Sequence, residues 1–417
     1  MSEWKKVKLK DICSDIIDCV NKTAPVCDYE TPYKMLRTSD IRNGQINIEG
    51  LKCVSKETFE KWNRRGYLQK GDVIFTREAP VGEVGWLKDP KNLFLGQRLM
   101  FFRADNKKCD NRFLFYSLFF SDNKRSIIAK SNGSTVNHLR VPDCENIEIY
   151  IPDLLTQQKI AVILSRYDSL IENYQKQIKL LEEAAQRLYK EWFVDLRFPG
   201  FENTKIVDGV PEGWEKEPLN EVFSYVRGKS YSTSELSDEG CIMVNLKNIQ
   251  AFGGYKRGAE KRFVGSYKKE QTLKKGDLVM GVTDMTQERR LVGHVALIPD
   301  FNEPVTFSMD LIKLVPFNVP TSFLYCSMRY GEISKQISPL ANGVNVLHLK
   351  PEAMMGIVML VPCKELVEKF CIFVDETINK ILNNQSQIRL LTEARDRLLP
   401  KLMGGEMDVV LENYPAV

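Results

Sequence analysis

The sequence "RGKS" at residues 227–230 matches the last residues of a phosphate-binding loop. Such a loop binds the phosphates of a nucleotide through its backbone amides. That loop also needs a glycine five positions before Gly228, where Phe223 stands. Pro-Asp pairs occur three times, but none has a well-placed acid-x-Lys behind it, as a nuclease site would require. The Asn/Asp-Pro-Pro-aromatic loop of amino-methyltransferases is missing. We therefore expect no nucleotide-binding, nuclease or methyl-transfer centre in this chain.

The histidines and cysteines do not form a catalytic or metal-binding pattern either. His138, His294 and His348 have no obvious nucleophile beside them, so we do not expect general-base catalysis. The 10 cysteines are scattered singly, whereas a zinc site needs clustered thiolate or imidazole ligands. We interpret the cysteines as reduced residues that mostly fill the core. The sequence thus predicts no metal, no bound cofactor and no enzyme activity of its own.

Polar residues that could hydrogen-bond to a ligand gather in short runs. In the first half of the chain these are Arg37, Thr38, Ser39, Asp40, Arg77, Glu78, Gln97, Arg98, Asn132, Ser134, Thr135, Asn137, His138 and Arg140. In the second half they are Asn245, Lys247, Asn248, Asp284, Thr286, Gln287, Arg289, Arg290, Asp310, Asn342, Asn345, His348 and Lys350. For any single residue, a solvated charge or a local turn is an equally good interpretation. As clusters they indicate binding, because polar runs recur at matching points of the two halves.

That recurrence is part of an internal repeat of about 210 residues. The clearest matches are "LQKGDVIF" (68–75) with "LKKGDLVM" (273–280), "RFLFYSL" (112–118) with "SFLYCSM" (322–328), "NGSTVNHLR" (132–140) with "NGVNVLHLK" (342–350), and "EAAQRLYK" (183–190) with "EARDRLLP" (393–400). The shift between the copies changes only in the middle of each unit. We interpret the chain as a duplicated module whose central part has diverged.

Each repeat begins with short β-type runs separated by turn signals, such as "GDVIFTR" and "RLMFFRA" in the first copy and "GDLVMGV" and "DLIKLVP" in the second. A helical stretch lies among them. The pattern predicts an α+β architecture, with a mixed α/β domain and a curved antiparallel sheet in each copy. The Lys-Gly-Asp before each strand predicts a tight turn, with Gly71 and Gly276 at positive φ.

Each repeat ends with a long helix. Its apolar positions alternate in steps of four and three, the period of a coiled-coil seam. The first helix carries Ile160, Leu164, Tyr167, Ile171, Tyr174, Ile178, Leu181, Ala185, Leu188 and Trp192. The second carries Phe370, Val374, Thr377, Ile381, Asn384, Ile388, Leu391, Arg395, Leu398 and Leu402. We expect the two helices to pair antiparallel around a pseudo-twofold axis, with two ordinary amphipathic helices as the alternative.

Composition sets broad limits. The net charge of +4 at pH 7 is compatible with a polyanionic partner but too mild to establish one. No apolar run has the eighteen or so residues that a membrane helix needs, and the first residues do not resemble a secretory signal. We therefore expect a cytoplasmic protein without a membrane partner.

Four segments carry a family resemblance that covers essentially the whole chain. They are "TREAPVGEVG" (76–85), "GSTVNHL" (133–139), "EAAQRLYKEWFVDLRFPGF" (183–201) and "LTEARDRLLPKLMGGEM" (391–407). With them the chain resembles the specificity subunits of type I restriction–modification enzymes. The resemblance implies two target recognition domains, each reading one half of a split site in double-stranded DNA. It also implies antiparallel conserved helices that separate these domains and dock two methyltransferase subunits.

The resemblance places the cofactors and the cutting activity on other subunits. S-adenosylmethionine, ATP and Mg²⁺ are expected on the methyltransferase subunits and on the restriction/translocase subunits of the full complex. The implied division of the chain is a first recognition domain at 1–152, a spacer helix at 153–198, a second recognition domain at 199–363 and a second spacer helix at 364–417.

The polar runs fit DNA readout, which needs donors and acceptors on rigid loops that reach the major groove. Arg64, Arg65, Lys261 and Arg262 look more like phosphate contacts, which position a protein without specifying a sequence. Residues 76–85 differ from their counterpart "VTDMTQERRLVGH" (282–294), so the hypothesis is a bipartite, asymmetric target. Three alternatives stay open: a partner methyltransferase without a cleaving subunit, a coiled-coil scaffold that binds proteins, and an enzyme in its own right.

Overall fold

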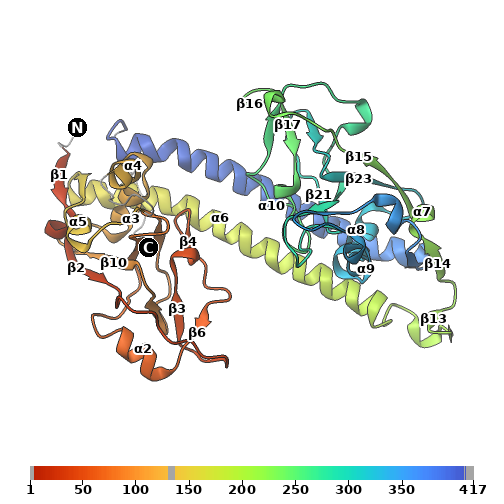
Figure 1. Cartoon of the computed structure of the whole chain (residues 1–417), viewed down its shortest axis with the longest axis horizontal. Coiled ribbons are helices and arrows are strands. Elements are labelled where there is room, and N and C mark those ends of the chain that lie inside the picture. Colours follow the sequence, from red (N-terminus) through yellow and green to blue (C-terminus); the bar gives the residue numbers. More distant parts are fainter. Residues whose placement is uncertain (1–3, 130–136, 408, 410–417) are drawn as a thin grey trace. The chain divides into compact units, whose positions relative to one another are not determined.

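The computed structural model describes residues 4–129, 137–407 and 409, and the chain divides into two units (Figure 1). Unit 1 contains Met1–Ser169 and Thr392–Val417, and unit 2 contains Leu170–Leu391. Unit 1 is therefore assembled from the two ends of the chain. In the described part of the chain, no helix combines the length and the apolar character that crossing a bilayer requires.

Unit 1 is built on an antiparallel sheet in the order β2-β10-β7-β8, formed by β2 (Cys13–Asp18), β10 (Leu99–Ala104), β7 (Val73–Thr76) and β8 (Val84–Trp86). Phe75 and Phe102 belong to the core on one face, and Ile74 and Phe101 to the core on the other. Because both faces are covered, the central strands are continuously apolar rather than alternating.

Smaller elements complete unit 1. A second sheet has the order β6-β3-β9, and there β3 and β9 run parallel. The further strands are β1 (Lys5–Lys8), β3 (Lys34–Leu36), β4 (Ile41–Arg42), β5 (Gln45–Ile46), β6 (Lys52–Cys53), β9 (Leu93–Leu95) and β11 (Glu148–Ile151), and β1 pairs with β11. The helices are α1 (Leu9–Ile12), α2 (Lys56–Trp62), α3 (Asn111–Phe119), α4 (Ser121–Ala129) and α5 (Val141–Glu145). Ser55 and Asp110 cap α2 and α3 with their side chains, as N-cap residues commonly do.

Unit 2 repeats this plan. Its main antiparallel sheet has the order β15-β23-β19-β21, formed by β15 (Phe223–Arg227), β23 (Leu311–Pro316), β19 (Leu278–Gly281) and β21 (Val295–Leu297). Its second sheet has the order β16-β18-β17-β22, and there β17 and β22 run parallel. The other strands are β12 (Ile206–Val207), β13 (Val210–Pro211), β14 (Glu215–Pro218), β16 (Leu236–Ser237), β17 (Cys241–Val244), β18 (Lys261–Phe263), β20 (Thr283–Asp284), β22 (Val305–Phe307), β24 (Leu347–His348) and β25 (Val358–Val361). The helices are α7 (Leu219–Val222), α8 (Thr321–Tyr330) and α9 (Ile333–Ile337).

The repeat found in the sequence is therefore a repeat of strand order. Both units also contain a parallel pair, β3–β9 and β17–β22, in addition to the antiparallel sheet that the sequence predicts. The two Lys-Gly-Asp turns are equivalent, with φ of +90° at Gly71 and +85° at Gly276. In each turn the aspartate carboxylate accepts a hydrogen bond from the backbone three residues earlier, at 2.7 Å for Asp72 and 3.0 Å for Asp277.

Two long helices run through both units: α6 (Leu154–Tyr189), which continues as a π-helical turn to Val194, and α10 (Lys364–Met403). In unit 1, Ile160 and Leu164 from the start of α6 share a core with Leu399 and Leu402 from the end of α10. In unit 2, Tyr189 and Trp192, at the other end of α6, pack on Phe370 near the start of α10, with ring centroids 6.1 and 5.9 Å apart. The antiparallel pairing is confirmed (Figure 1).

Each position of the predicted seam is buried or half-buried in the structure. The polar seam positions have polar partners. In unit 2, the buried Asn384 donates a hydrogen bond to Gln177 Oε1 at 3.1 Å. In unit 1, Arg395 donates to Asp168 Oδ1 at 2.9 Å, and the Thr377 hydroxyl of unit 2 bonds back to Phe373 O in its own helix. Matched polar pairs of this kind fix the register of a helix pair.

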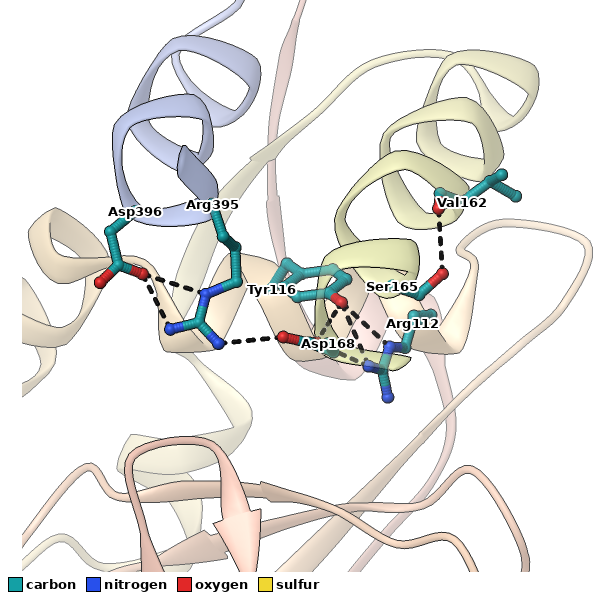
Figure 2. A network of polar contacts seen from close by, with 7 residues as sticks. All are labelled: Arg112, Tyr116, Val162, Ser165, Asp168, Arg395 and Asp396. Atoms are coloured by element: carbon teal, nitrogen blue, oxygen red, sulfur yellow. Dashed lines mark hydrogen bonds and ion pairs between the residues drawn. The ribbon is translucent and has the colours of Figure 1, made fainter. Parts of the chain in front are cut away.

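Figure 2 shows the network around Asp168, which joins three helices of unit 1. Its carboxylate accepts hydrogen bonds from Tyr116 at 2.5 Å and Arg112 at 2.7 Å, both on α3, as well as from Arg395 on α10. Arg395 also pairs with Asp396 at 2.8 Å. Burial raises the pKa of Tyr116, so the phenol stays protonated as a donor. One carboxylate on α6 thus joins α3 of unit 1 to both long helices.

We expect Asp168→Ala to destabilise unit 1 by about 3 kcal/mol, because it leaves two largely buried guanidinium groups without their shared carboxylate. Asp122→Ala is the matched control, since it removes an exposed pair with Arg125 and should change stability little. Urea unfolding, with hydrogen exchange at α3 to locate the effect, measures the difference. Equal stability of the two variants would contradict a structural role for the network.

Candidate functional site

Three segments of unit 1 meet where β7 ends and β10 begins, and we call residues 77–78, 97–98 and 137–140 the first loop cluster. The backbone amide of Arg77 donates to Arg98 O at 2.8 Å, and the amide of Leu139 donates to Arg77 O at 3.0 Å. The Arg77 side chain also donates to Leu139 O at 3.2 Å. Segments far apart in the sequence are therefore held rigidly side by side.

The first loop cluster carries both positively and negatively charged side chains. Arg98, half of whose side chain is exposed, pairs with Glu78 at 3.1 Å. Gln97 is exposed and accepts a hydrogen bond from Thr23 at 3.2 Å. Asn137, His138 and Arg140 are exposed, and Arg140 pairs with Asp143 at 3.0 Å. Asn132, Ser134 and Thr135 lie outside the described residues.

Unit 2 joins three equivalent segments by the same backbone hydrogen bonds. They are residues 282–291, 308–310 and 342–350, which we call the second loop cluster. The amide of Val282 donates to Asp310 O at 2.9 Å, and the amide of Leu349 donates to Val282 O at 2.8 Å. Thr283 lies opposite His348 in the β20–β24 pair, as Glu78 lies opposite His138 in unit 1. By these matching hydrogen bonds, Asp310 is the counterpart of Arg98, and Thr283 is the counterpart of Glu78.

The chemistry at these equivalent positions is inverted. In unit 1 a guanidinium, which only donates hydrogen bonds, pairs with the Glu78 carboxylate. In unit 2 a carboxylate, which only accepts, takes a hydrogen bond from the Thr283 hydroxyl at 3.1 Å and one from Ser308 at 3.3 Å. Equal backbone frames thus present a donor in one unit and an acceptor in the other.

Asp284 shapes the loop that follows β20. Its fully buried carboxylate accepts hydrogen bonds from the backbone amides of Leu291 at 2.6 Å, Thr286 at 2.8 Å and Val292 at 3.1 Å. Burial opposes its ionisation, but these hydrogen bonds outweigh that effect and hold the pKa of Asp284 below its ordinary value. Asp284 therefore organises the loop from inside and is not available to a ligand.

The exposed residues of this loop face solvent around that carboxylate. Gln287 is exposed and donates to Val344 O at 3.0 Å, which ties the loop to the 342–350 segment. Arg290 is exposed beside Glu288 at 2.8 Å, whereas Arg289 is half-buried. The remaining predicted residues of the segment, Asn342, Asn345, His348 and Lys350, are exposed.

The two remaining predicted groups form equivalent turns directly after β3 and β17, next to the loop clusters. The amide of Gly96 donates to Leu36 O and the amide of Ser308 donates to Val244 O, each at 2.8 Å. Arg37 and Asp40 flank one 3-10 turn and pair at 2.9 Å, and Thr38 and Ser39 lie between them. Asn245 and Asn248 flank the matching turn, are buried, and donate their amides to Ala259 O at 2.7 Å and Lys256 O at 2.9 Å. The sequence did not reveal that these side chains cap turns. Among the predicted residues of the two turns, Ser39 and Lys247 are the exposed ones.

Several other polar groups are also engaged within the fold. Arg65 pairs with Asp18, Lys261 with Tyr231, and Arg262 with Glu303, whereas Arg64 is exposed. His294 is buried, and burial lowers its pKa. Over residues 4–129, 137–407 and 409, no group of three or more histidine, cysteine, aspartate or glutamate side chains is placed to hold a metal ion.

Comparison with known proteins identifies the family. A family model described as the type I restriction modification DNA specificity domain matches residues 1–183. The MjaIX specificity subunit of Methanocaldococcus jannaschii is 29% identical over 98% of this chain and 94% of its own length. The HindI specificity subunit of Haemophilus influenzae is 22% identical over 98% of this chain and 100% of its own.

This chain belongs to the type I restriction–modification specificity subunits. A crystal structure of the S subunit from M. genitalium has the same fold, with a TM-score of 0.61 and 20% identity over 96% of each chain. As a specificity subunit, the chain is the DNA-specificity component of its system and is non-catalytic within the complex.

Asp284→Asn should loosen the loop of the specificity subunit that follows β20, because the carboxamide has one acceptor oxygen in place of two. It cannot accept both from Thr286 on one side and from Leu291 and Val292 on the other. We expect a cost of about 1–3 kcal/mol, seen as faster hydrogen exchange at pH 7 of the backbone amides on the side that loses its acceptor. In the wild type this contribution is present at neutral pH and is lost as the pH falls below 3.8, toward the lowered pKa of Asp284. The exposed Asp238→Asn is the control, and equal exchange in both variants would refute the role of Asp284.

Proposed function

We propose that each unit reads one half of a bipartite, asymmetric site in double-stranded DNA through its loop cluster. We also propose that α6 and α10 set the spacing of the two halves and dock two methyltransferase subunits. In this proposal the restriction/translocase subunits join the complex, and S-adenosylmethionine, ATP and Mg²⁺ are bound by the partner subunits.

The observation that carries this proposal is the inversion of chemistry between two equivalent loop clusters. A guanine edge in the major groove offers two acceptors, which suit the Arg98 guanidinium. An exocyclic amino group of adenine or cytosine is a donor, which suits the Asp310 carboxylate. Equal frames with opposite hydrogen-bonding character favour two unlike half-sites over a repeated one.

Exposed cations of both units support a duplex as the ligand, and two of them belong to the second loop cluster itself. Arg64, Lys247, Arg290 and Lys350 are exposed in the structure. Phosphate contacts from such residues would orient each unit on the DNA and would make binding weaker as salt rises.

The long helices support a fixed spacer. With 36 and 40 residues, α6 and α10 are about 54 and 60 Å long at about 1.5 Å per residue. That length corresponds to roughly 16–18 base pairs at about 3.4 Å each. Leu155 and Leu180 of α6, and Ile372 and Phe373 of α10, are exposed apolar residues suited to protein docking.

Selection of bound duplexes from a random library by the full chain tests this function. We expect two unlike conserved blocks separated by a fixed number of free positions. Arg98→Ala should relax the preference at one base of one block by about 10-fold to 100-fold, because a bidentate contact to guanine is lost.

The control for that variant is Lys6→Ala, which also removes a positive charge from unit 1. Lys6 lies in β1, away from the β7–β10 end where Arg98 sits, so the selected blocks should be unchanged. No selected sequence at all, or equal effects of the two variants, would contradict the proposal.

A further inference from the structure

Unit 2 holds three strongly exposed apolar side chains within its polar loop cluster. Met285 is 76% exposed, Met309 is 54% exposed and Val344 is 88% exposed. They belong to the three different segments that the cluster joins. Exposed apolar side chains on all three segments of an otherwise polar site point to a ligand with an apolar feature of its own.

Hydrogen bonds hold the segments that carry these side chains. Met285 lies between Asp284 and Thr286, which bond to each other at 2.7 and 2.8 Å. The amide of Met309 donates to Lys229 O at 2.9 Å, and the next residue, Asp310, bonds to Thr283. Val344 O accepts from Gln287. The fold thus fixes these side chains at the surface rather than letting the loops collapse over them.

At two of these three positions, those of Met309 and Val344, the apolar character is particular to unit 2. The position of Met309, directly before the Asp310 counterpart of Arg98, is occupied in unit 1 by Gln97. The position of Val344, in the repeated "NGVNVLHLK" segment, is occupied in unit 1 by Ser134. The two loop clusters therefore differ in apolar content as well as in charge.

Resting on the proposed function, we propose that unit 2 recognises an adenine–thymine pair, with Met309 and its apolar neighbours contacting the thymine methyl group. The C5-methyl of thymine is the apolar group among the base edges of the major groove. The adenine of the same pair presents an amino group, which donates to a carboxylate. Adjacent Met309 and Asp310 offer the matching apolar group and acceptor.

Substitution of thymine by deoxyuridine tests this, because it removes the methyl group and keeps every hydrogen-bonding atom. The probes are the duplexes selected by the full chain, with each thymine replaced in turn. We expect the Kd to rise about fourfold at one or more positions of the block that Asp310→Ala alters, the factor expected from burying one methyl group. In Met309→Ala the thymine and deoxyuridine duplexes should bind equally.

Phe317→Ala is the matched control, because Phe317 is an exposed apolar residue that follows the far end of β23, whereas Met309 precedes its start. It should leave the thymine preference intact. If the chain selects no sequence, the proposed function itself fails.

If the chain selects sequences but tolerates deoxyuridine at each position of that block, the inference about thymine fails alone. A thymine preference that Met309→Ala leaves unchanged would also overturn it. So would DNA bending that depends on Met309 without any thymine preference, since that result indicates a wedge between base steps.

Discussion

The packing of α6 against α10 is the constraint on which both halves of the molecule depend. Each helix contributes one end to unit 1 and the other to unit 2, so each core is completed by residues from distant parts of the chain. The seam is largely apolar, but Asp168–Arg395 and Gln177–Asn384 allow only one register without leaving buried polar groups unpaired. The β-sheet regions of both units therefore pack on the same pair of helices.

The two duplicated sheets position their loop clusters in the same way, but the side chains on those loops differ. The hydrogen bonds that join the loop clusters are backbone contacts at equivalent positions, so they survive changes of side chain. The same backbone arrangement carries Arg98 in unit 1 and Asp310 in unit 2. At the preceding position it carries Gln97 in unit 1 and Met309 in unit 2. Because the backbone contacts do not depend on these side chains, the two copies of the module can differ in the groups they present. The proposed function needs such a difference.

The sequence was sufficient for features with a repeat or a period behind them. The likeness of the two units, the positive φ at Gly71 and Gly276, and the antiparallel long helices follow from repetition and from the 3.5-residue spacing. The order of the strands in each sheet was not predicted. Contacts between distant residues could not be predicted. Nothing in the sequence marks Asp168 as the partner of Arg395, or Asn245 and Asn248 as buried turn caps, because these roles depend on which segments the fold brings together. The parallel β3–β9 and β17–β22 pairs have no local signal either.

In the proposed function, one chain holds two DNA-reading units of unlike specificity at a fixed spacing. Sequencing of modified bases in the genome that encodes this chain, with and without its gene, measures this directly. The account predicts a methylated motif that disappears with the gene and consists of two different short blocks separated by a constant number of unspecified bases. A contiguous motif, a perfect palindrome, or a spacing that varies from site to site would contradict it.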